Sequence, residues 1–146
     1  MKKLLSVGLI VLLTVALLTA CGGATKQEQG TKTAAYKDGV YKAEESQFDD
    51  HGWKGQIEIK VEGGKITEVK YDEVNQEGKK KSEDTEYHKR FKEQKNVDLL
   101  KAYETLEKDL VEKQDPDAVD TYTGATGTTT KFKTLAKEAL KEAQSK

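Results

Sequence analysis

The chain has 146 residues, with 25 lysines and arginines against 26 aspartates and glutamates, which gives a formal net charge of −1. This balance provides no basic surplus to neutralise phosphates, so nucleic acid is excluded as a predicted partner. The single cysteine cannot form an internal disulfide, and two histidines without a further thiol argue against a structural zinc site. We therefore predict no metal site, and the length permits one domain of ordinary size.

The first 20 residues have the pattern of a secretory signal peptide. Lys2 and Lys3 precede an apolar stretch, residues 4–18, that is too short for a comfortable membrane-spanning helix. The stretch runs into Leu18-Thr19-Ala20-Cys21, which resembles the lipobox of bacterial lipoproteins. That resemblance implies cleavage before Cys21, lipid on its thiol, acyl chains such as palmitate, and a location on the extracytoplasmic face of the cell membrane. The alternatives are an ordinary signal peptide with an incidental cysteine, or a buried core cysteine.

The segment after the signal peptide is predicted to be a spacer. Residues 22–35 contain no aliphatic residue larger than alanine and show no periodicity, so residues 21–35 are interpreted as a lipidated cysteine and a flexible tether. One domain, residues 36–146, follows.

The first half of this domain has strand patterns. Residues 39–43 are a plausible first strand, and Ile57, Ile59 and Val61 alternate with charged residues in the period of a strand with one buried face. Gly63-Gly64 predicts a tight hairpin turn, because either glycine can take positive φ. The return strand is expected over residues 65–74.

The second half of the domain has helical patterns. Residues 76–95 are charged and are predicted to form a connection and a short helix whose Tyr87 and Phe91 face the core. Asn96 is predicted to cap a second helix, whose apolar face recurs at three and four residues and which Pro116 ends. A last helix is expected from about 128 to 143. Strands followed by helices predict an α+β domain in which helices pack on a small antiparallel sheet.

Between the last two helices, residues 117–127 form a Thr/Gly-rich entrance to a helix. Helix starts leave backbone N–H groups unpaired and carry partial positive charge, so they can hold a phosphate. Gly124 and Gly127 let the backbone approach such a group, and Thr123 and Thr126 offer hydroxyls there. The residues alone leave two interpretations open, an anion or phosphate site and an ordinary loop with a helix cap.

The sequence Asp120-Thr121-Tyr122-Thr123-Gly124-Ala125-Thr126 resembles the flavinylation motif of FMN-binding domains, Asp-x-x-(Ser/Thr)-Gly-Ala-(Ser/Thr). Such domains occur in the C subunit of sodium-translocating NADH:quinone reductases and in extracellular flavin lipoproteins. Residues 37–41, 51–53 and 64–69 and Tyr87 resemble the small lipoprotein members as well. The resemblance implies an FMN-binding domain type of fold and FMN joined to Thr126 through a phosphoester. It also implies that the other cofactor-binding residues are Asp120, Tyr122, Thr123, Gly124 and Ala125.

The resemblance further implies an electron carrier rather than an enzyme. A FAD:protein FMN transferase would attach the flavin using FAD and magnesium, which agrees with a threonine hydroxyl that has no evident base nearby. Electrons would come from a membrane quinone pool or NADH dehydrogenase and pass to an extracellular acceptor such as ferric iron or another redox protein. Asp120 could orient either the loop or the metal of the transferase.

Other functions and roles remain open at this point. The chain could be a ligand-binding or scaffold lipoprotein without flavin, the source of a signalling peptide cut from its signal sequence, or an enzyme that uses Thr126. Trp53 is a flavin-stacking residue or a core aromatic, and Tyr122 is expected to contact the cofactor. His51 is predicted on a surface turn, with a flavin or metal contact as alternatives, and His88 is predicted to be exposed. Lys79–Lys81 could touch anionic lipid.

Overall fold

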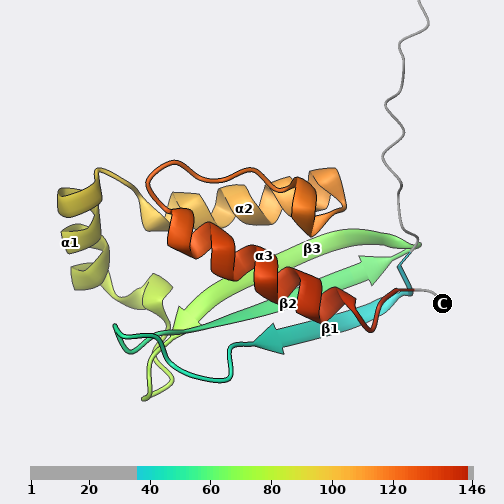
Figure 1. The fold of residues 1–146 in the computed structure, drawn as a ribbon, viewed down its shortest axis with the longest axis horizontal. Coiled ribbons are helices and arrows are strands. Elements are labelled where there is room, and N and C mark those ends of the chain that lie inside the picture. The colour runs from blue at the N-terminus through green and yellow to red at the C-terminus, as the bar shows by residue number, and fades with distance from the viewer. Residues whose placement is uncertain (1–35, 145–146) are drawn as a thin grey trace, which may run out of the picture.

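The computed structural model describes residues 36–144 (Figure 1). The predicted signal peptide, residues 1–20, and the predicted lipidated Cys21 with its tether to residue 35 lie outside the described residues. Within residues 36–144, no helix is long and apolar enough to cross a bilayer.

Three strands form an antiparallel sheet in the described part of the chain, in the order β1-β2-β3. They are β1 (Gly39–Glu44), β2 (Lys54–Glu62) and β3 (Lys65–Val74). Gly63 and Gly64 join β2 to β3 with φ of 60° and 75°, so the predicted glycine hairpin is confirmed. The pairing of β2 with β3 shifts register between Lys60 and Val61, so that Val61 lies opposite Ile66 and one residue of β3 is skipped.

The two faces of the sheet differ as the alternation predicts. Ile57 and Ile59 on β2 pair with Tyr71 and Val69 on β3, and all four side chains are buried on the face that carries the helices. The opposite face carries charged residues, such as the Lys42–Glu58 pair with an N–O distance of 2.7 Å.

The helices cover one face and one edge of the sheet (Figure 1). They are α1 (Thr85–Lys95), α2 (Leu99–Lys113) and α3 (Thr126–Leu140), with short 3-10 turns η1 (Lys81–Glu83) and η2 (Pro116–Ala118). α3 packs against β1 and β2, whereas α2 packs against β3. The Tyr71 N–H donates to the Glu107 carboxylate at 2.7 Å, and the Gln114 amide bonds both backbone groups of Ile66, so α2 satisfies the outer edge of β3.

The α+β prediction is confirmed, but the ends of α2 and α3 differ from those predicted. Asn96 does not cap α2; it ends α1 in the left-handed conformation, with φ of 54°, and Asp98 caps α2 by accepting from the Lys101 N–H. α2 ends before Pro116, because Gln114 turns left-handed with φ of 61° and its side chain bonds to β3. α3 begins at Thr126 and ends at Leu140, earlier at both ends than the predicted 128–143.

The core lies between the sheet and the helices. Its largest fully buried apolar side chains come from β2, β3, α2 and α3, and they are Ile59, Ile66, Leu106, Leu110, Phe132, Leu135 and Leu140. Tyr87 and Phe91 of α1 are half-buried against this core, which agrees with the predicted orientation of the short helix. α1 itself has no fully buried residue, so it is the least tightly packed of the three helices.

Candidate flavin site

The predicted flavinylation motif occupies the loop from η2 to α3 and the first residue of α3. Val119 and Ala125 are buried at the two ends of the loop, with 3% exposure each, while Asp120, Thr121, Thr123 and Gly124 are exposed between them. This anchoring at both ends presents the intervening residues to solvent. Thr126 is exposed and is the first helical residue of α3, so its hydroxyl lies at the N terminus of that helix.

The start of α3 is open to an anion. Ala125 occupies the N-cap position, where a residue without a side-chain acceptor cannot cap the helix, and no other side chain among residues 36–144 does so. The first-turn N–H groups therefore point outward unpaired beside the Thr126 hydroxyl. A phosphate joined to that hydroxyl would lie where these groups and the helix dipole favour negative charge.

The buried Thr129 fixes the loop through two hydrogen bonds of its hydroxyl group. Its side chain is 2% exposed, donates to the Ala125 carbonyl at 3.1 Å and accepts from the Tyr122 N–H at 3.1 Å. One hydroxyl therefore fixes both sides of the turn that precedes Thr126. Sequence reasoning missed this residue, although its position three residues before Phe132 places it on the buried face of α3.

Gly124 is required by packing as well as by conformation. Its φ is 83°, a region that other residues rarely adopt, and a Cβ built on it would overlap the Cγ2 of Val97. Gly127, by contrast, has no neighbour within 4 Å of such a Cβ, so the structure gives it open space rather than a close approach. Both glycines were expected to let the backbone approach a bound group. The structure instead shows that Gly124 is required by its own conformation and by its contact with Val97.

Asp120 is anchored to α2 through charged side chains that we call the loop cluster: Asp109, Lys113 and Asp120. Lys113 pairs with Asp120 at 2.7 Å and with Asp109 at 3.1 Å, and the Asp120 N–H donates to the Asp109 carboxylate at 2.6 Å. The hydrogen bond from Lys113 lowers the pKa of Asp120. The Asp120 side chain is nonetheless 89% exposed, so it is fixed in place and still accessible to a partner protein.

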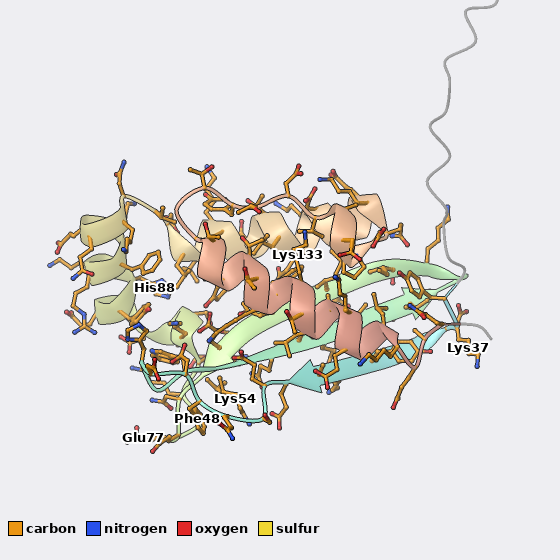
Figure 2. All side chains as sticks on the ribbon, viewed as in Figure 1. Lys37, Phe48, Lys54, Glu77, His88 and Lys133 are labelled. Carbon is orange, nitrogen blue, oxygen red and sulfur yellow. The ribbon has the colours of Figure 1, made fainter. Side chains whose placement is uncertain are left out.

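Lys133 fastens the loop from the side of α3. Figure 2 labels this residue on α3. Its ammonium donates to the carbonyls of Asp117 and Val119 at 3.1 and 2.9 Å. Because these contacts use main-chain carbonyls, they hold the path of the loop while leaving its side chains free to act.

A cleft of about 560 Å³ opens beside the loop. Asp120 to Thr123 line one side of it, and the connection from α1 to α2, Asn96 to Asp98, lines the other together with Lys92. The structure therefore brings the predicted Asp120, Tyr122 and Thr123 to one cleft. Tyr122 also packs against a small apolar cluster of Val97, Ala102 and Ala125.

The aromatic and histidine residues singled out in the sequence lie elsewhere. Trp53 is buried, meets Tyr87 edge to face at 5.5 Å between ring centroids, and carries the Lys81 ammonium over its ring at 5.0 Å. His51 is exposed in a turn whose N–H groups bond to Asp49, as predicted for a surface turn. The prediction that His88 is exposed is wrong, because both nitrogens of its ring are buried.

A second group of charged residues, the buried cluster, lies at the junction of β3, η1 and α3: Asp49, Glu73, Lys81 and Lys131. The Glu73 carboxylate receives the Lys81 ammonium at 2.8 Å and that of Lys131 at 3.4 Å, and Lys131 also pairs with Asp49 at 2.7 Å. The hydroxyls of Tyr71 and Tyr103 each lie 3.3 Å from Glu73. Burial and the Glu73 charge raise the pKa of Tyr71, so it remains protonated and donates to Glu73.

The comparisons with known proteins identify the class. The FMN-binding domain family matches residues 52–141, and the chain belongs to that family. The chain is also similar to a 15 kDa lipoprotein of Treponema pallidum (strain Nichols), with 36% identity over 107 residues that cover 73% of this chain and 76% of the relative. The resemblance to an FMN-binding domain lipoprotein is therefore confirmed.

Two solved structures share the fold. A crystal structure of a Clostridium perfringens protein has a TM-score of 0.71 and 42% identity, covering 74% of this chain and 88% of that one. A solution structure from Clostridium thermocellum has a TM-score of 0.52 and 31% identity, covering 75% and 93%. The α+β architecture is therefore shared with experimentally solved proteins.

The residues present fit an FMN group. The exposed Thr126 hydroxyl, the uncapped start of α3 and the adjacent cleft together offer an attachment point, an anion-binding helix end and space beside the loop. Which of these residues contact the flavin stays a prediction.

Proposed function

We propose that this chain is a membrane-anchored extracytoplasmic flavoprotein that carries FMN covalently on Thr126 and shuttles electrons. The observation that carries the proposal is the placement of Thr126: an exposed hydroxyl at the uncapped start of α3, in a chain of the FMN-binding domain family. The donor is a membrane quinol or an NADH dehydrogenase, and the acceptor is extracellular. FMN supplies one- or two-electron transfer when bound.

Attachment requires a second protein. The Thr126 hydroxyl forms a new phosphoester bond to the FMN phosphorus of FAD, the pyrophosphate bond of FAD breaks, AMP leaves, and the hydroxyl proton passes to a base. An unassisted threonine hydroxyl is a weak nucleophile, so this step requires a base. A FAD:protein FMN transferase supplies that base and its magnesium.

The position of the site in the domain suits an anchored carrier. The described chain begins where α3 ends, because the Lys37 N–H donates to the Ala143 carbonyl at 2.7 Å. The start of α3 lies toward the other end of the domain, next to α1 (Figure 1). A helix of 15 residues spans about 22 Å, so a lipid on Cys21 would leave Thr126 at the end farther from the tether. This arrangement favours access by an external acceptor.

The attachment is tested by exporting the full chain together with a flavin transferase and running a denaturing gel. Flavin fluorescence is expected to travel with the wild-type protein and with Thr126→Ser, and to vanish in Thr126→Ala. Thr121→Ala is the matched control, because Thr121 is an exposed threonine of the same loop. A dark wild-type band, or a fluorescent Thr126→Ala band, would contradict the assignment, and intact mass would show whether one FMN less water has been added.

A further inference from the structure

The helix α1 carries a concentration of positive charge on a domain that is otherwise acidic. Its basic residues outnumber its two acidic ones, and all of them are exposed: Lys89, Arg90, Lys92 and Lys95. The other described residues, 36–84 and 96–144, contain 16 lysines against 23 aspartates and glutamates. A negatively charged molecule is therefore repelled by most of this surface and attracted at α1.

The charges of α1 are available to a ligand. We call the side chains of Lys89, Arg90, Lys92 and Lys95 the basic face of α1. Within residues 36–144, only Lys92 of this set has an ion-pair partner, Asp98, at a nitrogen–oxygen distance of 3.7 Å. Both side chains of that pair are exposed, so water screens it and the basic face keeps its positive potential.

The basic face lies beside the loop that carries the motif. The backbone carbonyl of Lys95, the last residue of α1, lies 3.9 Å from the position that a Cβ on Gly124 would occupy. Phe91 packs against the apolar cluster that contains Ala125, the residue before Thr126. Figure 1 shows α1 at the same end of the domain as the start of α3, away from the start of the described chain. A molecule held at α1 is therefore next to the predicted attachment point.

The kind of ligand follows from what α1 lacks. The exposed large apolar side chains of the described residues are Val40, Phe48 and Leu100, and none of them belongs to α1. A stable interface between proteins normally has an apolar or aromatic centre. A face that offers charge without such a centre suits a small anion. Its place at the end farther from the predicted lipid anchor disfavours a membrane surface as the ligand.

We propose that the basic face of α1 is the docking surface for a small, negatively charged electron acceptor, such as a ferric ion held by carboxylate ligands. This inference rests on the proposed flavoprotein function. Two molecules of a one-electron acceptor take the two electrons of a reduced flavin in turn, and the protons of the flavin pass to water. The basic face raises the local concentration of such an acceptor beside Thr126, so its effect is on the rate of encounter.

The test compares two oxidants of opposite charge on the flavin-loaded full chain in an uncharged detergent. The protein is reduced anaerobically and mixed with ferricyanide or with hexaammineruthenium(III), and flavin absorbance follows reoxidation at several salt concentrations. Because the domain as a whole is acidic, its net charge alone would make the rate with ferricyanide rise with added salt. Attraction at the basic face predicts the opposite, a rate with ferricyanide that falls with added salt.

Two matched double variants locate the effect. Lys89→Gln with Arg90→Gln removes two charges of the basic face that lie outside the cleft beside the motif. Lys65→Gln with Lys141→Gln removes two exposed charges near the other end of the domain, where Tyr36 and Lys37 bond to Gly64 and Ala143.

At about 0.1 M salt, exposed charges act over about 10 Å. The variant of the basic face should therefore slow the reaction with ferricyanide about threefold, and the control variant should leave it nearly unchanged. The reaction with hexaammineruthenium(III) should not slow in either variant, which shows that both are folded and hold a reactive flavin.

The results separate this inference from the function on which it rests. Flavin-loaded wild type whose reaction with ferricyanide speeds up with salt overturns the inference and leaves the proposed function intact. A variant of the basic face that is no slower than the control variant does the same. Protein that takes up no flavin overturns both.

Discussion

The buried cluster around Glu73 and the loop cluster around Asp120 use the same chemistry in opposite surroundings. Each holds a segment to a helix through lysine and carboxylate groups at 2.7 to 3.4 Å. The side chains of Lys81 and Glu73 are 7% and 3% exposed, whereas those of Lys113 and Asp120 are 29% and 89% exposed. Water weakens the second cluster and not the first, so one fixes the fold and the other positions a loop that stays accessible.

This difference between the two clusters indicates which part of the domain is rigid. Glu73 of β3 binds two lysines, from η1 and α3, and two tyrosine hydroxyls, one of them from α2, so β3, η1, α2 and α3 are joined at one buried point. The motif loop has no equivalent buried charge. It depends on Thr129, on main-chain contacts from Lys133 and on the exposed Lys113. Under the proposed function a flavin transferase must reach this loop, which requires the loop to lie outside the core.

The largest expected effect follows removal of Glu73. Glu73→Ala leaves the buried Lys81 ammonium and two tyrosine hydroxyls without their acceptor, and should cost about 3–5 kcal/mol of the free energy of unfolding. Glu58→Ala, which removes the partner of Lys42 on the solvent-exposed face of the sheet, should have a much smaller effect, because water screens an exposed ion pair. Urea unfolding measures both.

A double variant checks that burial is the cause. Glu73→Leu together with Lys81→Met removes both buried charges, and should recover most of the stability lost in Glu73→Ala. If Glu73→Ala and Glu58→Ala prove equally destabilising, the distinction between the two clusters is wrong.

A smaller effect is expected at the edge of the buried cluster on acidification. Burial by itself raises the pKa of Asp49, but the hydrogen bond from Lys131 and those from two backbone N–H groups outweigh it and hold this pKa below its ordinary value. A carboxyl with a lowered pKa stabilises the fold above its unfolded pKa, and this stabilisation is lost as pH falls through the folded pKa.

The free energy of unfolding should therefore fall more steeply from about pH 5 to about pH 3 in wild type than in Asp49→Asn, by about 0.5–1 kcal/mol after screening. Urea midpoints at several pH values measure the difference. Asp50→Asn is the matched control, because Asp50 is an exposed carboxylate in the same turn. An unchanged slope in Asp49→Asn would show that Lys131 and Asp49 do not interact appreciably in solution.

The smallest effect on stability is expected in the loop cluster. Lys113→Met removes the cation that holds Asp120 to α2, and should change the free energy of unfolding least of the variants considered, because water screens this pair. Because the loop then loses one of its anchors, flavinylation should slow by about two- to fivefold, the equivalent of a weak surface pair. The initial rate of flavin incorporation measures this.

Lys137→Met is the control for that experiment, because Lys137 pairs with Asp117 on the surface outside the motif. Equal rates of flavinylation in the two variants would remove Lys113 from the positioning of the motif.

Much of the architecture could be predicted from local pattern. Alternation in β2 and β3, with Gly63-Gly64 between them, led to the correct hairpin, since strand period and turn conformation depend on neighbouring residues. The helix boundaries were harder. Asn96 and Gln114 both take the left-handed conformation at helix ends, and Gln114 does so where its side chain bonds to Ile66, 48 residues away. A local signal carries no information about that partner.

The candidate site likewise has a part that the sequence predicts and a part that only the structure shows. The motif from Asp120 to Thr126 could be read from seven consecutive residues, but its supports come from distant positions. Val97 fills the space that makes Gly124 obligatory, and Lys113 reaches Asp120 from the preceding helix. His88 was predicted to be exposed. Both nitrogens of its ring are buried instead.

The sequence by itself determined the hairpin, the apolar faces of the helices, the family and the predicted acceptor Thr126, because these depend on spacing along the chain. The tertiary structure decided which charges are buried, which hydroxyl holds the motif loop and which histidine has unpaired nitrogens. Those properties depend on segments that meet across the fold: Glu73 with Lys81 and Lys131, and Tyr122 with Thr129. Exclusion of water at such meeting points sets the strength of a polar contact, and a linear pattern does not encode it.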